Sequence, residues 1–215
     1  MGFCALVGAS DFNVEHFLSL DFDCVIAVDG GYQHLEEISV VPDHVLGDFD
    51  SLGYVPDHPS VRSFSPQKDE TDMELALSWA TEQGYDTFLV YGGLGGRLDL
   101  SYALFQLLAR FAQAGFRVFG IGAESVVTAL GGAGQSTLSF SEAASGTISV
   151  FSASAQASMV EESGLAYTLS DATLQNTEPL GVSNEFIGTP ASISVGEGTL
   201  LVFFPVKAWS ALLPL

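Results

Sequence analysis

Basic residues are scarce in this sequence. The 215 residues contain 6 lysines and arginines against 26 aspartates and glutamates, which gives a formal net charge of −20. A protein of that charge repels the phosphates of nucleic acids and of anionic lipids, so we expect neither nucleic acid nor membrane as a partner. A phosphate-bearing substrate would be repelled as well unless a divalent cation mediated its approach.

Cysteines and long apolar runs are also few. Cys4 and Cys24 are the two cysteines, and each lies in an apolar run typical of a buried strand, so we expect core thiols, with a disulfide as the alternative. The four histidines have no cysteine partner at zinc spacing. The sequence lacks both a run of ~20 apolar residues and the basic start of a signal peptide, and we expect a cytoplasmic protein.

The first half of the chain alternates apolar strands with helices. The predicted strands occupy residues 3–8, 24–28, 61–64, 87–91 and 116–121. Ser10 or Asp11 could cap a first short helix, and Thr71 and Glu74 have the spacing of a helix capping box. Apolar strands followed by glycine-rich turns and helices are typical of a parallel α/β sheet, whose ligands bind at the carboxyl ends of the strands.

Beyond about residue 123 the pattern changes to short alternating segments rich in serine, threonine and glycine. The predicted strands are residues 125–130, 135–140, 147–152, 157–161, 167–169, 191–195 and 199–204, with residues 181–186 as a polar loop between strands. Such spacing is typical of an all-β sandwich or barrel. The sequence therefore predicts an α/β domain with a mostly parallel sheet over residues 1–122 and an all-β domain over residues 123–215.

Residues 42–51 contain two carboxylates, Asp48 and Asp50, separated by one aromatic residue. In an extended backbone both carboxylates would face one side while Phe49 pointed into the core. Carboxylates so close repel each other, and the arrangement favours a hard cation such as Mg²⁺ between them and a substrate phosphate. An acidic turn is the alternative, because Gly, Asp and Ser are common loop residues.

A second acidic cluster lies at the start of the helix predicted after Thr71. Asp69 and Asp72 belong to it, and Lys68, one of the few basic residues, lies beside them. The helix dipole favours an anion there by ~0.3–1 kcal/mol, which is reason enough for one or two acids. A lysine next to metal-binding carboxylates, however, is what a polyphosphate site requires.

Two predicted strands end in glycine-rich turns that carry charged residues. The first turn is Asp29-Gly30-Gly31, and the second, residues 92–99, contains Gly93, Gly96, Arg97 and Asp99. Glycines allow a ligand to approach the backbone, and N–H groups with a guanidinium can hold an anion. A plain turn from strand to helix is the alternative for the first of them.

In order and spacing, these motifs resemble the thiamin pyrophosphokinase family. The matching segments are residues 29–31, 42–51, 68–72, 95–99, 164–169 and 181–186, so the resemblance spans nearly the whole chain. It implies an N-terminal α/β domain, a C-terminal β-sandwich and a homodimer with active sites at the subunit interface. The implied reaction is the Mg²⁺-dependent transfer of the β,γ-pyrophosphoryl group of ATP to the hydroxyl of thiamin, giving thiamin diphosphate and AMP.

The resemblance also implies roles for the N-terminal residues. Asp48, Asp50 and Asp72 would hold Mg²⁺, with Asp29 and Asp69 nearby. Lys68 and Arg97 would contact the phosphates. The residues that would line the nucleotide are Gly30, Gly31, Gly93 and Gly96.

Thiamin would be bound by residues from both halves of the chain. Asp99 would bind its polar ring or help to deprotonate its hydroxyl, with Asp72 as the alternative base. Ser183 and Asn184 would contact thiamin from the partner subunit. A carboxylate-rich pocket suits a cationic substrate on Coulombic grounds.

The sequence departs from the family pattern at a few positions. Leu100 stands where a histidine usually follows the Arg97-Leu98-Asp99 motif, and Tyr32 and Gln33 replace the usual alanine and asparagine. These changes concern nucleotide contacts and rate more than the class of reaction. The alternatives are a catalytically weak relative that binds nucleotide or thiamin as a sensor, and a diphosphotransferase that acts on another primary alcohol.

Overall fold

The computed structural model describes residues 3–65, 67–131 and 134–214. The chain divides into two compact units. The first comprises the residues up to Leu104 together with Gly120–Ala123, and the second comprises Phe105–Phe119 and the chain from Glu124 onward. The predicted functional boundary at residue 122 stays a prediction, because α4 (Leu98–Gln113) and β6 (Arg117–Ile121) each contribute residues to both units.

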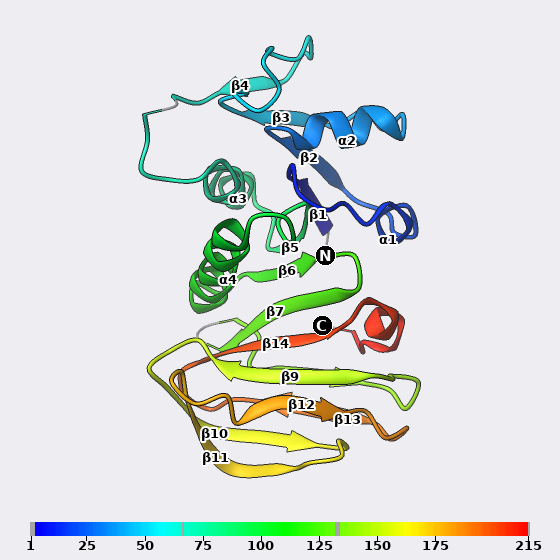
Figure 1. The fold of residues 1–215 in the computed structure, drawn as a ribbon, viewed down its shortest axis with the longest axis vertical. Coiled ribbons are helices and arrows are strands. Elements are labelled where there is room, and N and C mark those ends of the chain that lie inside the picture. Colours follow the sequence, from blue (N-terminus) through cyan, green and yellow to red (C-terminus); the bar gives the residue numbers. More distant parts are fainter. Residues whose placement is uncertain (1–2, 66, 132–133, 215) are drawn as a thin grey trace. The chain divides into compact units, whose positions relative to one another are not determined.

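The first unit is an α/β structure, drawn from blue to green in Figure 1. Its elements before α4 are β1 (Phe3–Val7), α1 (Val14–Leu18), β2 (Cys24–Val28), α2 (Gly31–Glu37), β3 (His44–Gly47), β4 (Val61–Ser63), α3 (Asp72–Glu82) and β5 (Thr87–Tyr91). Five strands pair in the order β5-β1-β2-β3-β4, and each of these pairs is parallel. The predicted parallel α/β sheet is therefore confirmed.

Burial explains why these strands are continuous apolar runs in the sequence. Every residue of β5 is buried, and so are four of the five residues of β1. Helices α2 and α3 pack on the sheet, and α3 directs Ala76, Leu77 and Ala80 inward. A parallel sheet covered by helices has little surface that faces water, so its central strands need no polar alternation.

The observed N-cap residue agrees with the sequence-based prediction at α3 and differs from it at α1. The predicted cap is confirmed at Thr71, whose hydroxyl accepts the Glu74 N–H at 3.2 Å. At α1 the cap is Asn13, whose Oδ1 accepts the His16 N–H at 3.0 Å, and the expectation of Ser10 or Asp11 was wrong. The Asn13 side chain also donates to the backbone oxygens of Gly122 and Ala123, which favours Asn13 as the helix start.

The second unit is a β-sandwich. Its strands are β7 (Ser125–Gly131), β8 (Thr137–Phe140), β9 (Thr147–Ser152), β10 (Gln156–Ser163), β11 (Leu169–Gln175), β12 (Gly181–Glu185), β13 (Ala191–Ser194) and β14 (Thr199–Pro205), followed by the 3₁₀ helix η1 (Val206–Ala211). Strands β12-β9-β14-β7 form one antiparallel layer, and β11-β10-β13-β8 form the other. Phe140 of β8 meets Phe204 of β14 with ring centroids 5.1 Å apart, so the two layers share a core and the predicted sandwich is confirmed.

Residues 181–186 were expected to be a loop, and that expectation was wrong. Residues 181–185 form the edge strand β12, which pairs with β9 through Gly181–Val150 and Asn184–Ile148. The register shifts between these two pairs, and Ser183 has a φ of +61°. An edge strand with a bulge lacks the regular apolar alternation that identifies a strand in sequence.

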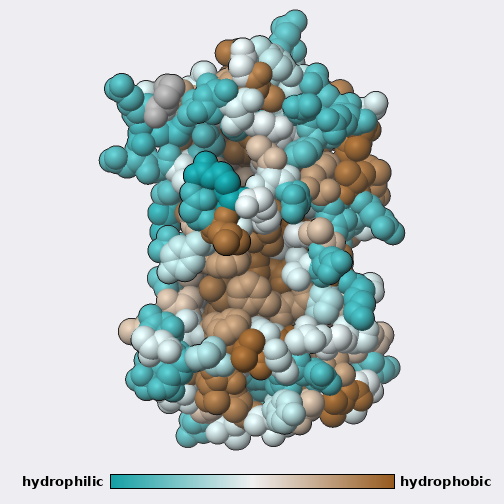
Figure 2. Space-filling model, viewed as in Figure 1, coloured by the Kyte–Doolittle hydropathy of each residue, from teal (hydrophilic) through white to brown (hydrophobic). Residues whose placement is uncertain are grey.

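Both cysteines are buried and free, which confirms the expectation of core thiols. They lie opposite each other on the neighbouring parallel strands β1 and β2. Among the described residues, no helix combines the length and the apolar character needed to cross a bilayer. Figure 2 shows hydrophilic side chains gathered over β3, β4 and the adjoining loops, as expected from the excess of acids.

Candidate functional site

The ends of β2 and β3 bring three carboxylates together. Asp29 follows β2, and Asp48 and Asp50 follow β3. One carboxylate oxygen from each of the three lies within 4.8 Å of the other two, and within the described chain this is the one group of acidic, histidine or cysteine side chains that meets this condition. The carboxyl ends of neighbouring parallel strands meet at one edge of the sheet, which is why Asp29 becomes a neighbour of residues 19 and 21 positions further along the sequence.

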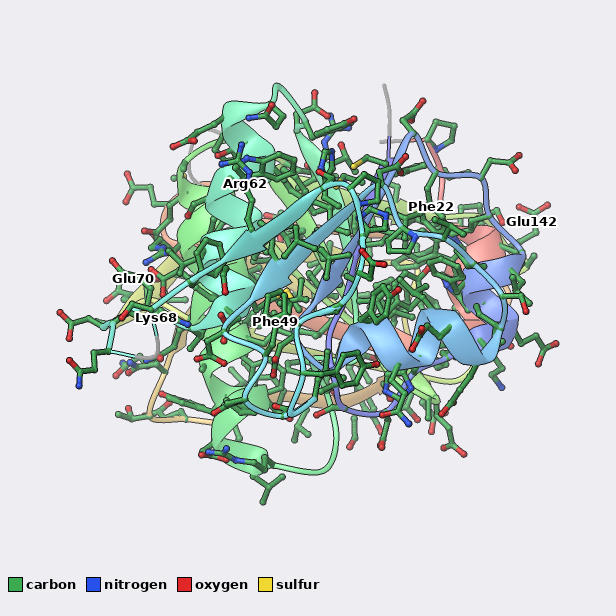
Figure 3. All side chains as sticks on the ribbon, turned by 90° about the horizontal axis from the view of Figure 1, so that it is seen from above. Phe22, Phe49, Arg62, Lys68, Glu70 and Glu142 are labelled. Atoms are coloured by element: carbon green, nitrogen blue, oxygen red, sulfur yellow. The ribbon has the colours of Figure 1, made fainter. Side chains whose placement is uncertain are left out.

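The backbone in this group is unusual. Asp29 and Phe49 have φ angles of +48° and +61°, a region that residues with a side chain rarely adopt. Phe49 is 3% exposed and points into the interior of the unit, as predicted (Figure 3). The extended backbone predicted across Asp48 and Asp50 was wrong, because the left-handed turn at Phe49 presents the two flanking carboxylates.

Lys68 neutralises part of this negative charge. Its Nζ lies 3.2 Å from Asp48 Oδ2 and 2.8 Å from Asp72 Oδ1. Figure 3 shows Lys68 pointing inward from the connection between β4 and α3, whereas Glu70 lies at the outer edge of that connection. The structure therefore joins Asp72 to the carboxylate group through a shared ammonium, while Asp69 is exposed.

The pKa values of the three paired groups shift in directions that burial and pairing explain. Burial opposes the charge of Lys68, but hydrogen bonds to Asp72 and Asp48 outweigh it and raise its pKa. Burial would also raise the pKa of Asp48, but the Asp50 N–H and the Lys68 ammonium lower it overall. The pKa of Asp72 is raised, because burial exceeds the opposing effect of Lys68.

A divalent cation fits the three carboxylates. Asp29 Oδ1 is buried and has no hydrogen-bond partner among the described residues, while Asp29 Oδ2 accepts the Ser51 hydroxyl. A buried carboxylate oxygen without a partner is costly, and a hard cation coordinated by oxygen ligands would remove that cost. Asp29 therefore joins Asp48 and Asp50 in this group, whereas Asp72, which the sequence analysis also assigns to the metal, lies outside the group and shares the Lys68 ammonium with Asp48.

The glycines of the two glycine-rich turns differ in how much space surrounds them. A Cβ at Gly31 would lie 1.7 Å from the Val7 carbonyl oxygen, and one at Gly93 would lie 2.9 Å from Leu104 Cδ2, so both allow close internal packing. A Cβ at Gly30 would meet the Ala9 side chain at 2.8 Å. Gly96, with a φ of +59°, has its nearest such contact at 3.7 Å, so of the four it leaves the most room for a ligand.

Arg97 and Asp99 form an exposed pair at the start of α4. Arg97 donates through Nε to Asp99 Oδ1 at 3.2 Å and through Nη2 to Asp99 Oδ2. The hydrogen bond from Arg97 lowers the pKa of Asp99 and raises that of Arg97. Asp99 is therefore ionised at neutral pH. The Arg97 side chain is 69% exposed and thus accessible to an anion.

Ser183 and Asn184 lie on β12 in very different environments. Ser183 is exposed, and its backbone N–H donates to Ser149 Oγ at 3.0 Å. Asn184 is 5% exposed, and its Nδ2 donates to Glu162 Oε2 at 2.8 Å. The sequence interpretation did not single out Glu162, although its position two residues after Val160 on one strand was a signal that it faces the core.

Two family models match successive parts of the chain. Residues 18–119 match the thiamin pyrophosphokinase catalytic domain, and residues 135–200 match the thiamin pyrophosphokinase vitamin B1 binding domain. Together they cover more than three quarters of the sequence. The chain belongs to the thiamin pyrophosphokinase family. The carboxylate group with Lys68 lies in the first match, and Glu162, Ser183 and Asn184 lie in the second.

Named relatives agree with this membership in the thiamin pyrophosphokinase family. The chain is 31% identical to the thiamine pyrophosphokinase of Bacillus subtilis over 99 residues, which is 43% of this chain and 46% of that protein. It is 25% identical to thiamin pyrophosphokinase 1 of Caenorhabditis elegans over 189 residues, 83% of this chain and 76% of that protein. The chain thus matches less than half of the Bacillus protein by sequence.

The fold agrees over a longer stretch. The crystal structure of the Bacillus subtilis thiamine pyrophosphokinase superposes with a TM-score of 0.81 at 23% identity, covering 94% of this chain and 98% of that one. The α/β and β-sandwich architecture is therefore that of the thiamin pyrophosphokinase fold.

We expect replacement of Glu162 by glutamine to change how stability depends on pH. Burial raises the pKa of Glu162 above its ordinary value of 4.5, with a smaller opposing effect of the Asn184 amide. A raised pKa in the folded state means that stability is lost as the pH rises from 4.5 through the folded pKa. We measure the unfolding free energy of Glu162→Gln and of the parent protein by urea denaturation from pH 4 to 8. The value for the variant minus the value for the parent should increase as the pH rises. A difference independent of pH would contradict this expectation.

Proposed function

We propose that this chain is a Mg²⁺-dependent thiamin pyrophosphokinase that transfers the β,γ-pyrophosphoryl group of ATP to the hydroxyl of thiamin, giving thiamin diphosphate and AMP. One observation carries the proposal. The carboxylates of Asp29, Asp48 and Asp50 converge beside Lys68 at the carboxyl ends of parallel strands, within the segment that matches the family's catalytic domain. Phosphoryl-type transfer depends mainly on positioning and charge neutralisation, which such a group supports.

Asp29, Asp48 and Asp50 would hold the metal. When bound, Mg²⁺ would neutralise phosphate oxygens and orient the transferred group. The sequence-based assignment of Asp72 to the metal stays a prediction. The three carboxylates also repel free ATP, which is itself an anion. Because a bound cation would reduce this repulsion, metal binding and nucleotide binding should depend strongly on each other.

Lys68 and Arg97 would bind the phosphates. Lys68 is held between Asp48 and Asp72, so its ammonium has a fixed position before any ligand arrives. Fixed donors stabilise developing charge without the cost of reorganisation. Arg97 lies exposed beside Gly96, where the turn leaves space, and a phosphate could compete with Asp99 for its guanidinium.

Two aspartates are candidates for accepting the proton of the thiamin hydroxyl. Arg97 lowers the pKa of Asp99, which makes Asp99 a weak base. Burial raises the pKa of Asp72, which brings it closer to the pH at which a base works best. We therefore favour Asp72 as the base and Asp99 as a contact to the substrate or to Arg97.

The remaining parts of the proposal rest on the family. Ser183 would contact thiamin, since its exposed hydroxyl lies in the segment that matches the vitamin B1 binding domain. The homodimer, its shared active sites, the cytoplasmic location and the domain boundary at residue 122 stay predictions. The two family matches, which end at residue 119 and begin at residue 135, support that boundary.

Release of AMP tests the proposed function directly. The purified chain is incubated with ATP and Mg²⁺, with and without thiamin, and AMP, ADP and thiamin diphosphate are separated by chromatography. We expect AMP that depends on thiamin, in equal amount to thiamin diphosphate, without ADP. Binding of thiamin or ATP without AMP would instead support a sensor, and AMP formed only with another primary alcohol would change the substrate.

We expect Asp50→Asn to lower kcat by about 100-fold or more, because loss of one anionic oxygen ligand removes several kcal/mol of charge stabilisation. Asp50 is exposed and its carboxylate repels its neighbours, so the melting temperature should change by only a few degrees. The measurement is Mg²⁺-dependent turnover together with thermal unfolding. Asp21→Asn, the same substitution at an exposed position outside the site, is the control, and full turnover by Asp50→Asn would refute the metal assignment.

We expect Ser183→Ala to raise the KM for thiamin about 3- to 10-fold while the KM for ATP stays unchanged, which corresponds to one lost hydrogen bond. The backbone N–H of Ser183 keeps its bond to Ser149, so the strand should be retained. Steady-state kinetics with each substrate varied in turn provides the test, and Ser170→Ala on the exposed strand β11 is the control. An equal rise in both KM values would remove Ser183 from the thiamin pocket.

A further inference from the structure

The side chain of Asn184 has its hydrogen-bonding capacity filled inside the protein. Its Oδ1 accepts the N–H groups of Tyr167 and Glu185, each at 2.9 Å. Its Nδ2 donates to Glu162 Oε2 at 2.8 Å and to the Tyr167 carbonyl oxygen at 2.6 Å. A primary amide offers two donors and two acceptor lone pairs, so no position is left for a ligand.

These bonds fasten a loop to the edge of the sandwich. Asn184 binds both backbone polar groups of Tyr167, so the loop after Gly164 is held against β12. The Ala166 N–H donates to the Glu185 carbonyl oxygen at 3.0 Å, which adds a second tie. The Tyr167 ring remains 71% exposed, and Ser183 is exposed immediately before the buried Asn184. One buried amide thus fixes two exposed residues.

Glu162 is the third residue that this amide contacts, and the one that it contacts through a side chain. It lies on β10, in the layer opposite to β12, and is 2% exposed. Its neighbours in the sheet are Leu169 and Ile193, both apolar. Its Oε1 is buried without a hydrogen-bond partner among the described residues, so the carboxyl is only half satisfied. Stability alone would favour an apolar residue at such a position.

The carboxyl has an orienting effect that an apolar residue would lack. Glu162 Oε2 accepts from the nitrogen of Asn184, and this choice directs the amide oxygen towards the N–H groups of Tyr167 and Glu185. Without that acceptor, the second N–H of Asn184 would be buried without a partner, and the amide would be held by its bonds to Tyr167 and Glu185 alone. The anchor of the backbone around Tyr167 would then be weaker.

We propose that Glu162 is a positioning residue for thiamin binding, because its carboxyl orients the Asn184 amide that fixes Tyr167 and Ser183 at the surface of the sandwich. This inference rests on the proposed function and deepens it. Asn184 then acts through the backbone that it holds. Glu162 acts one step further from the substrate, across the core of the sandwich.

Steady-state kinetics of three variants tests the proposal. Glu162→Leu keeps the approximate volume and removes the acceptor, and it should raise the KM for thiamin about tenfold or more while the KM for ATP changes less than about twofold. Glu162→Gln keeps an oxygen that can accept from Asn184, and its KM for thiamin should remain within about threefold of the parent value. Glu161→Leu is the matched control, since the exposed Glu161 carboxylate binds the Asp171 N–H on the outside of the same strand.

Three outcomes would overturn the proposal. These are an unchanged KM for thiamin in Glu162→Leu, an equal rise in both KM values, and a loss in Glu162→Gln as large as in Glu162→Leu. Should Glu162→Leu fail to fold, Glu162→Asp withdraws the carboxyl by one methylene from an Asn184 contact of 2.8 Å and should raise the KM for thiamin at least threefold. An unchanged KM for thiamin in the folded aspartate variant would equally refute the proposal.

A local measurement separates failure of this inference from failure of the proposed function. Exchange of the Tyr167 and Glu185 amide protons, followed by NMR without substrate, should be faster in Glu162→Leu or Glu162→Asp and unchanged in Glu161→Leu. If the parent chain releases AMP with thiamin, but Glu162→Leu does not raise the KM for thiamin more than the KM for ATP, only the role of Glu162 is wrong. If the parent chain neither binds nor converts thiamin, the proposed function fails and the role of Glu162 fails with it, whatever the exchange rates show.

Discussion

Mutual repulsion among carboxylates is the constraint on which the first unit depends. Asp29, Asp48 and Asp50 bring carboxylate oxygens within 4.8 Å of one another in a chain of net charge −20, and the nearby Lys68 offsets part of their charge. Such a group is unfavourable by itself, and left-handed backbone at Asp29 and Phe49 adds to its cost. The buried strands and the anchored Phe49 ring hold it in place. The site is therefore built at the expense of stability, as binding sites for cations commonly are.

In the second unit the constraint is different, because exposed residues are held in position by an edge strand. Strand β12 is bulged, and Ser183 on it adopts a φ of +61°. The position of this strand is fixed by the neighbouring buried residue Asn184, whose amide donates to Glu162 in the opposite layer of the sandwich. A buried polar network costs more than apolar packing, yet it specifies one arrangement of the strand and its neighbouring loop. The same reasoning explains why an acid is tolerated between Leu169 and Ile193.

Predictions from the sequence were most accurate where a local pattern of residues has a single physical explanation. Apolar runs gave the strands of the parallel sheet, and Thr71 with Glu74 gave the start of α3, because burial and capping are local signals. It failed at residues 181–186, where an edge strand lacks apolar alternation. It also misjudged the backbone at Phe49, since an extended and a left-handed conformation can both bury one aromatic ring between two exposed acids.

The sequence by itself determined the family, the two kinds of fold and the residue types available for the site, because motif order and apolar periodicity are properties of the linear chain. Only the tertiary structure decided which acids meet. It brought Asp29 to Asp48 and Asp50, linked Asp72 to Asp48 through Lys68, and placed Glu162 against Asn184. These contacts join residues from different elements of the fold, and their partners depend on sheet order, register and local backbone angles that no single segment encodes.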